Sequence, residues 1–350
     1  PDGPQGAHNA PLRESLPGKG KQRAAAAPDK QEWTVPVEWR ATGRYPVKEG
    51  SRTLGQGGFG IVMHCVDLLL PSKEVAKKRQ MLEVGCPVPN KYILREIAAL
   101  RRCQGHVNVI DIKDVIYNAD APSPYVDIIL PLAAASLDRV IRHEKGGVDV
   151  ITAKTFVQQV LKGLCWIHHR GWLHLDLKPA NVLIFRDFTC RITDFGLAKK
   201  KNPALKLSSP CGTIGYRPPE ELFNTHYADE SMDVWPVGTI YAELRKGGAI
   251  FDTSSNVACF KSMIEVTGVE FKSVFEFPAP GSGIEGGRTF LLRPPNPARL
   301  SHLNPEELTF IMSIFTLEPR YRPSARGVFK HRFWDRYPKP DKSLLTLSLP

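Results

Sequence analysis

The sequence lacks the features of a membrane protein and of a disulfide-stabilised protein. Its 350 residues contain no run of about 18 apolar residues, so we expect no transmembrane helix. The first residues include no apolar core of a secretory signal peptide, so we expect a protein that is not secreted. The seven cysteines are odd in number and form no C-x-x-C pair, which argues against a disulfide framework or a zinc site. We therefore predict an intracellular protein of the cytoplasm, the nucleus or both.

Acidic residues are in short supply relative to basic ones. The chain has 47 Lys and Arg against 36 Asp and Glu, a net charge of +11. This imbalance favours anionic partners, although a solvated basic surface accounts for it equally well. Aromatic residues are not interleaved with the basic ones as in a nucleic-acid platform, so we expect no nucleic-acid partner.

Apolar patterning predicts two regions of different structure after a tail. Residues 1–44 are rich in Pro, Gly, Ala and Lys and are predicted to be disordered, with Trp33–Trp39 as either a docking end or part of a linker. Alternating and short apolar runs predict strands at 54–63 (a hairpin), 74–78, 107–117 and 125–132. Helical spacing is found at 92–103, 156–167, 233–245, 257–267 and 305–315. The fold class is therefore α+β, a small β-rich lobe followed by a larger helical lobe.

Three glycines in the predicted hairpin have the spacing G-x-G-x-x-G. They are Gly55, Gly57 and Gly60. Glycines let backbone N–H groups approach phosphates closely, because no Cβ stands in the way. A purely structural glycine turn is the simpler interpretation of this pattern alone. A β run follows the glycines here, whereas a dinucleotide-binding motif would lead into a helix.

A lysine and a glutamate follow the glycine turn. Lys78 lies in the next predicted strand, where it can reach phosphate oxygens, and Lys77 is its rival for that role. Glu96 lies in the one helix predicted for the first lobe. It is either a solvated helix residue or the partner that holds Lys78 toward a nucleotide.

Two polar motifs follow in the helical lobe. Residues 174–181 read HLDLKPAN, and residues 193–196 read TDFG. With the upstream glycines, lysine and glutamate, this chain resembles the eukaryotic protein kinase family, whose motifs are H-R-D-x-x-x-x-N and D-F-G. The resemblance covers roughly residues 52–334, and the K-P-x-N sequence is typical of serine/threonine kinases. It implies a bilobal kinase domain at 45–337, with lobes at 45–132 and 133–337 and a C-terminal tail at 338–350.

The resemblance implies a role for each matching residue. Asp176 would orient the attacking hydroxyl and accept its proton, Lys178 would neutralise γ-phosphate charge, and Lys78 with Glu96 would complete the catalytic set. Asn181 and Asp194 would hold Mg²⁺. ATP would lie against a set of residues in both lobes: Gly55, Gly57, Gly60, Val62, Ala76, Lys78, Leu130, Pro131, Ala133 and Leu183.

Later segments extend the resemblance. Glu220 would pair with Arg322, and Asp233 would brace the catalytic loop from the helix that contains it. Pro236 lies in the same helix, where a proline destabilises least if it falls in the first turn. Residues 83–97 and the Tyr216-Arg217 pair are most similar to cyclin-dependent kinases. This similarity implies protein substrates with Pro after the acceptor and a cyclin-like activating partner at Cys86–Glu96.

Several positions depart from the family pattern. Leu175 stands where the family has the arginine that binds the activation-loop phosphate, and Ser208 and Ser209 lie where that phosphate would be attached. We therefore hypothesise that phosphorylation of Ser208 matters less here than in relatives. Cys211 in this loop is a candidate for oxidation, although most loop cysteines are inert. The alternative to an active kinase is a pseudokinase or scaffold that binds nucleotide or partners without efficient transfer.

Overall fold

The computed structural model describes residues 43–57, 60–70, 73–83, 88–202, 207, 211–222, 228–267 and 297–350. The chain forms two units, residues 1–34 and 35–350, and every described residue lies in the second. The predictions for the N-terminal tail, Cys86, Ser208 and Ser209 fall outside the described residues.

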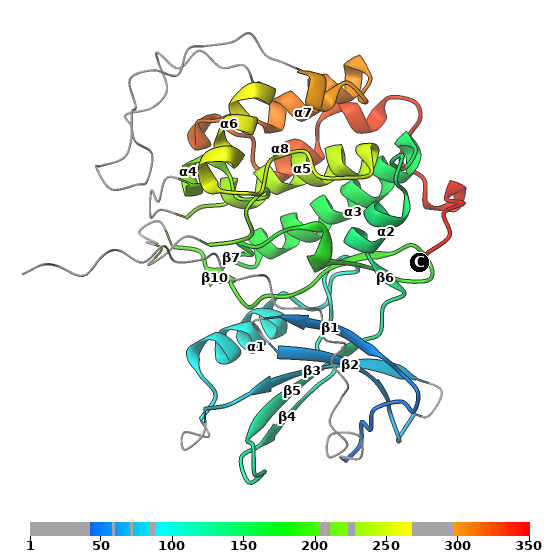
Figure 1. The fold of residues 1–350 in the computed structure, drawn as a ribbon, viewed down its shortest axis with the longest axis vertical. Coiled ribbons are helices and arrows are strands. Elements are labelled where there is room, and N and C mark those ends of the chain that lie inside the picture. Colours follow the sequence, from blue (N-terminus) through cyan, green and yellow to red (C-terminus); the bar gives the residue numbers. More distant parts are fainter. Residues whose placement is uncertain are drawn as a thin grey trace, which may run out of the picture. The chain divides into compact units, whose positions relative to one another are not determined.

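A five-stranded antiparallel sheet forms the first lobe, in the order β1-β2-β3-β5-β4 (Figure 1). Its strands are β1 (Thr53–Gly57), β2 (Gly60–Val66), β3 (Glu74–Met81), β4 (Asp114–Asn118) and β5 (Tyr125–Pro131). Gly60 has a φ of +119°, and a Cβ there would lie 2.1 Å from the carbonyl oxygen of Arg79. The hairpin thus needs a glycine at this position to lie against β3.

Helix α1 (Lys91–Cys103) belongs to the same lobe as the sheet (Figure 1). Asn90 caps its N-terminus by accepting hydrogen bonds from the backbone N–H groups of Tyr92 and Ile93. The buried face carries one charged residue, Glu96, among apolar ones. The apolar spacing that predicted the helix therefore also points Glu96 inward.

Helices make up most of the second lobe, with α3 (Val150–His169) and α5 (Ser231–Lys246) in its core. The other α-helices are α2 (Leu137–His143), α4 (Pro219–Leu222), α6 (Asn256–Thr267), α7 (Pro305–Ile314) and α8 (Ala325–Phe329). Short 3₁₀ segments are η2 (Pro179–Asn181), η4 (Pro297–Leu300), η5 (Pro319–Tyr321), η6 (Arg332–Asp335) and η7 (Lys342–Leu344). No helix in the described ranges has the length and apolar character needed to span a membrane.

Two small sheets frame the loops between α3 and α4. One is the three-stranded sheet β6-β8-β9, made of β6 (Ala135–Ser136), β8 (Val182–Ile184) and β9 (Cys190–Ile192). The other pairs β7 (Trp172–Leu173) with β10 (Lys199–Lys200). The polar motif at residues 174–181 therefore lies between two strand ends, in a loop fixed on both sides.

One expectation about local structure is wrong, and one open question about a proline is answered. The strand predicted at 107–117 is confined to Asp114–Asn118, since Val109 and Ile110 are buried in a connecting segment that pairs with β9 through an isolated bridge, Val109 to Ile192, and not as a strand of the first sheet. Pro236 lies in the second turn of α5, which begins at Ser231. There the proline ring removes the N–H that would bond to the carbonyl of Met232.

Residues after the kinase-like region pack against the second lobe. The backbone N–H of Asp341 donates to Thr155 Oγ1 of α3, and Lys342 Nζ lies 3.0 Å from Asp187 in the β8–β9 turn. Buried Lys154 donates to the carbonyl oxygens of Phe333, Arg336 and Pro338. The segment 338–350 is therefore attached to α3 by polar contacts.

Candidate active site

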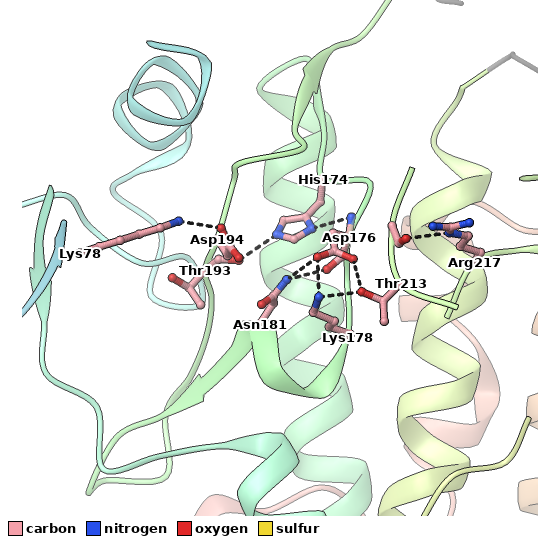
Figure 2. Close-up of polar contacts among 10 residues, drawn as sticks. Lys78, His174, Asp176, Lys178, Asn181, Thr193, Asp194, Thr213 and Arg217 are labelled. Carbon is pink, nitrogen blue, oxygen red and sulfur yellow. Dashed lines mark hydrogen bonds and ion pairs between the residues drawn. The ribbon is translucent and has the colours of Figure 1, made fainter. Parts of the chain in front are cut away.

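Lys78 joins the two lobes through two carboxylates. Its Nζ donates to Glu96 Oε1 at 2.6 Å and to Asp194 Oδ1 at 2.9 Å (Figure 2 draws the second contact). Lys78 comes from β3, Glu96 from α1, and Asp194 from the loop after β9. Three segments far apart in sequence therefore meet at one ammonium group.

The charges of Lys78 and Asp194 favour each other's ionised form, whereas burial raises the pKa of Glu96 above its ordinary value. Burial would lower the pKa of Lys78, but the charges of Glu96 and Asp194 outweigh it and raise that pKa above its ordinary value. Burial likewise opposes ionisation of Asp194, yet the adjacent Lys78 holds the pKa of Asp194 below its usual range. A protonated lysine and an ionised aspartate are the forms that bind phosphate and a metal cation.

The rival lysine lies on the other face of β3. Lys77 Nζ donates to the backbone carbonyl of Tyr45 at 2.8 Å, within a separate part of the sheet. Arg79, on the same face as Lys77, forms a buried ion pair with Asp127 of β5. Because strand side chains alternate, Lys78 faces the polar centre and its two neighbours stabilise the sheet.

Three polar side chains surround Asp176, two from the loop at 174–181 and one from Thr213 (Figure 2). Lys178 Nζ lies 2.7 Å from Asp176 Oδ2, and Asn181 Nδ2 donates to the Asp176 carbonyl at 2.8 Å. Thr213 Oγ1 donates to Asp176 Oδ1 at 2.8 Å and accepts from Lys178 at 2.7 Å. The carboxylate is thus fixed in one orientation by groups on both sides.

Asp233 braces this loop from α5. It accepts hydrogen bonds from the backbone N–H groups of His174 (2.8 Å) and Leu175 (2.7 Å), and contacts His168 Nε2 at 2.9 Å. Leu175 has a φ of 63°, a conformation that is uncommon for a non-glycine residue. The bond to Asp233 stabilises it, as the sequence predicted for a bracing aspartate. His174 also lies 2.9 Å from the carbonyl oxygen of Thr193, which ties this loop to Asp194.

The expected nucleotide-binding residues lie on strands that surround this centre. Ala76 pairs with Leu130 across β3 and β5, Val62 pairs with Lys78 across β2 and β3, and Leu183 lies in β8. Pro131 ends β5, and half-buried Ala133 follows it. A Cβ added at Gly55 or Gly57 would meet no atom within 4 Å, so the fold itself does not demand glycine there. These glycines leave open space of the kind that a phosphate group needs.

Residues 211–218, which we call the segment before α4, are anchored where they join that helix. Arg322 forms a bidentate ion pair with Glu220, at 2.7 and 2.9 Å, as the sequence predicted. Arg217 Nε donates to the carbonyl oxygen of Gly212 at 2.7 Å, and Gly212 has a φ of +85°. Gly212 and Arg217 line a small pocket together with Asp176, Leu175, Cys211, Thr213 and Tyr216.

Cys211 is buried, which favours the inert thiol over a site of oxidation. It belongs to an apolar group that we call the Leu175 cluster: Leu173, Leu175, Leu207, Cys211, Ala228 and Met232. Burial raises the pKa of its thiol, which makes the reactive thiolate scarce. The backbone N–H of Cys211 donates to Glu221 at 2.5 Å, so the segment is held by polar contacts as well.

Two residues of the centre were not found from the sequence. Thr213 carries no motif of its own, and only its place four residues before the recognised Arg217 could have suggested it. Gln80 donates to Glu96 Oε2 at 2.6 Å. Strand alternation from Lys78 would have placed Gln80 on the same face.

A family model for the protein kinase domain matches residues 49–334. The chain belongs to the protein kinase family. Mitogen-activated protein kinase HOG1 of Debaryomyces hansenii is 29% identical over 294 residues, which cover 82% of this chain and 73% of that protein. HOG1 of Candida albicans is also 29% identical over 294 residues, with 82% and 75% covered. A chain in the structure of the CAK complex from Chaetomium thermophilum bound to ATP-γ-S has a TM-score of 0.73 and 24% identity, and the match covers 86% of this chain and 94% of that one.

These comparisons confirm the predicted bilobal α+β kinase fold and the predicted serine/threonine protein kinase. Mitogen-activated protein kinases belong to the same larger group of kinases as the cyclin-dependent kinases, so the predicted group is confirmed as well. At 24% identity the CAK structure shows the fold alone.

Proposed function

We propose that this kinase transfers the γ-phosphate of Mg·ATP to serine or threonine hydroxyls of proteins, with Asp176, Lys178, Lys78 and Glu96 as its catalytic groups. The observation that carries the proposal is the simultaneous pairing of Lys78 with Glu96 and Asp194, beside an oriented Asp176. Phosphoryl transfer depends mainly on positioning and charge stabilisation, and this geometry supplies both. The pseudokinase alternative has no support in these contacts.

Asn181 and Asp194 fit the requirements of a Mg²⁺ site. Asn181 uses its Nδ2 to bind Asp176, so its Oδ1 lies on the opposite side of the amide. Asp194 is ionised and supplies carboxylate oxygen. Mg²⁺ prefers one or two carboxylate or amide oxygens together with phosphate oxygens and water. The cation would neutralise charge on the phosphates.

The chain's own residues then have separable roles. Asp176 accepts the proton of the substrate hydroxyl and orients it. Lys178, held between Asp176 and Thr213, lies where charge develops on the transferred phosphoryl group. Lys78 binds the phosphates of ATP from β3. The glycines at 55, 57 and 60 admit those phosphates, and Val62, Ala76, Leu130, Pro131, Ala133 and Leu183 enclose the base.

The pocket beside Asp176 supports a preference for proline after the acceptor residue. Gly212 has a positive φ, and its carbonyl oxygen accepts a hydrogen bond from Arg217 Nε. A substrate residue next to the acceptor therefore finds no carbonyl for its backbone N–H. Burying an N–H without a partner is costly, whereas proline has none.

The Leu175 cluster supports the hypothesis about Ser208. In the family pattern a phosphate is needed to hold the segment against an arginine. Here Leu175 instead packs with Leu207 and Cys211. Apolar contacts need no phosphate, so the segment stays near Asp176 whether or not Ser208 is modified.

The cyclin-like partner remains part of the proposal. Tyr92 and Leu94 of α1 are exposed apolar residues, as are Met81 and Val88 before it. These exposed apolar residues on and before the helix that carries Glu96 support a protein partner there. Such a partner would raise the activity above its basal level.

Transfer of labelled phosphate to paired peptides tests the function. The peptides differ only in Pro or Ala after the acceptor serine. We expect transfer that requires Mg²⁺ and favours the Pro peptide, and Asp176→Asn should reduce it by about a hundredfold or more. Asp187→Asn, which changes an aspartate of the β8–β9 turn outside the site, is the matched control and should transfer normally. Equal rates in wild type and Asp176→Asn would contradict the proposal.

A further inference from the structure

A buried glutamine holds the second carboxylate oxygen of Glu96. Gln80 lies two residues after Lys78 on β3, so both side chains project from the same face of the strand. Gln80 Nε2 donates to Glu96 Oε2 at 2.6 Å, while Lys78 Nζ donates to Oε1 at 2.6 Å. Both carboxylate oxygens of Glu96 therefore accept hydrogen bonds from side chains of β3.

The two donors differ in what else they must do. Lys78 divides its donors between Glu96 and Asp194, and in the proposed reaction it also binds phosphate. Gln80 is 6% exposed, and its amide faces Glu96. When Lys78 turns to a phosphate, Gln80 can still hold Glu96 and the helix that carries it.

Outward movement of α1 would break both bonds at once. Gln80 would then leave amide donors buried without Glu96, and the cost of a buried unpaired polar group opposes that movement. An apolar side chain at position 80 would pack against α1 in either position. The hydrogen bond therefore favours the one position of α1 in which Glu96 meets Lys78.

We infer that Gln80 is a positioning residue for phosphate transfer, which holds Glu96 and thereby keeps α1 in place without a partner protein. The catalytic part of this inference rests on the proposed function. The position of α1 can be measured without any assay of activity. The proposed function and the role of Gln80 in holding α1 can therefore fail separately.

Hydrogen exchange of the α1 amides in Gln80→Met is the direct test. Methionine is similar in size to glutamine but cannot donate a hydrogen bond, so we expect exchange in α1 to rise about tenfold relative to α5, which corresponds to about 1.4 kcal/mol. Gln159→Met is the matched control, because the half-buried Gln159 of α3 also makes amide hydrogen bonds, to Asn108, Cys190 and Phe188. It should leave exchange in α1 unchanged.

Kinetics separates positioning from simple stability. We expect Gln80→Met to lower kcat about tenfold with a smaller change in the KM for Mg·ATP, since the interaction acts through the orientation of Lys78. Gln159→Met should keep the wild-type kcat. If the wild-type protein transfers no phosphate, the proposed function fails, and the α1 exchange still decides whether Gln80 holds the helix.

Unchanged α1 exchange in Gln80→Met, or the same change in Gln159→Met, would overturn the inference. If Gln80→Met does not fold, the test uses the double variant Gln80→Met with Glu96→Met, in which no carboxylate is left unpaired. Its α1 exchange should equal that of Glu96→Met alone, and a further rise would count against the inference.

Discussion

Helix α1 and the segment before α4 approach the catalytic centre from different directions and are held by different forces. Buried hydrogen bonds from Lys78 and Gln80 to Glu96 fix the position of α1, in addition to its apolar face. The segment before α4 is attached mainly by the Leu175 cluster, with Cys211 bonded to Glu221. A polar attachment fails when one partner is lost, because the other is left buried and unpaired. An apolar attachment weakens gradually and does not respond to a nearby phosphate.

Loss of Lys78 should have the largest effect, because the α1 attachment and the phosphate contact depend on the same ammonium. Lys78→Met should lower kcat/KM by about a hundredfold or more and leave Glu96 and Asp194 without a counter-charge. Steady-state kinetics and urea unfolding measure the two consequences. Lys77→Met is the control: it removes an equally buried lysine from the opposite face of β3 and should spare catalysis. Comparable loss of kcat/KM in both variants would contradict the assignment of Lys78.

A charge placed in the Leu175 cluster should have the next largest effect. Leu175→Arg buries a guanidinium among apolar side chains, so the unmodified protein should lose about tenfold in activity. Phosphate on Ser208 would offer the new arginine a partner, so kinase treatment should restore part of the activity. Peptide phosphorylation is measured before and after Ser208 is phosphorylated, which tests whether a polar contact can replace the apolar one. Full activity in untreated Leu175→Arg would show that the cluster does not hold the segment.

Removal of the Arg217 side chain should change specificity more than rate. Arg217→Met frees the Gly212 carbonyl, which can then accept the N–H of a residue after the acceptor. We expect the preference for Pro over Ala at that position to fall by about tenfold, the worth of one hydrogen bond. The ratio of kcat/KM for the two paired peptides measures it. An unchanged ratio would place the specificity elsewhere.

The smallest effect is expected at Ser208. Ser208→Ala should change the rate by less than about twofold, since the Leu175 cluster requires no phosphate. The same peptide assay measures it, with Ser209→Ala as a neighbouring control. Loss of activity in Ser208→Ala would refute the hypothesis that phosphorylation there matters less than in relatives.

The polar centre could be predicted from the sequence because its chemistry restricts residue types. Asp176, Asn181 and Asp194 occur at spacings that few other folds require, and the structure brings all three to one loop region. Glu96 was predicted as a reachable partner of Lys78, and the helical spacing that buries Ile93 and Leu100 explains why.

Supporting contacts could not be predicted in the same way. Gln80 and Thr213 act through side chains that many positions tolerate, so only the folded geometry identifies them. Val109 and Ile110 were predicted to lie in a strand because they are apolar. They are buried in a connecting segment that contacts β9 instead. Leu175 was recognised as a departure, whereas its apolar partners come from segments distant in sequence.

Helix α1 and the segment before α4 are both held in place by the chain's own contacts. The most direct measurement is the rate of phosphate transfer by the protein purified alone and treated with phosphatase. We predict Mg·ATP-dependent transfer that is equal in wild type and Ser208→Ala and is lost in Asp194→Asn. Transfer that appears only after Ser208 is phosphorylated, or only when a partner is added, would contradict the claim.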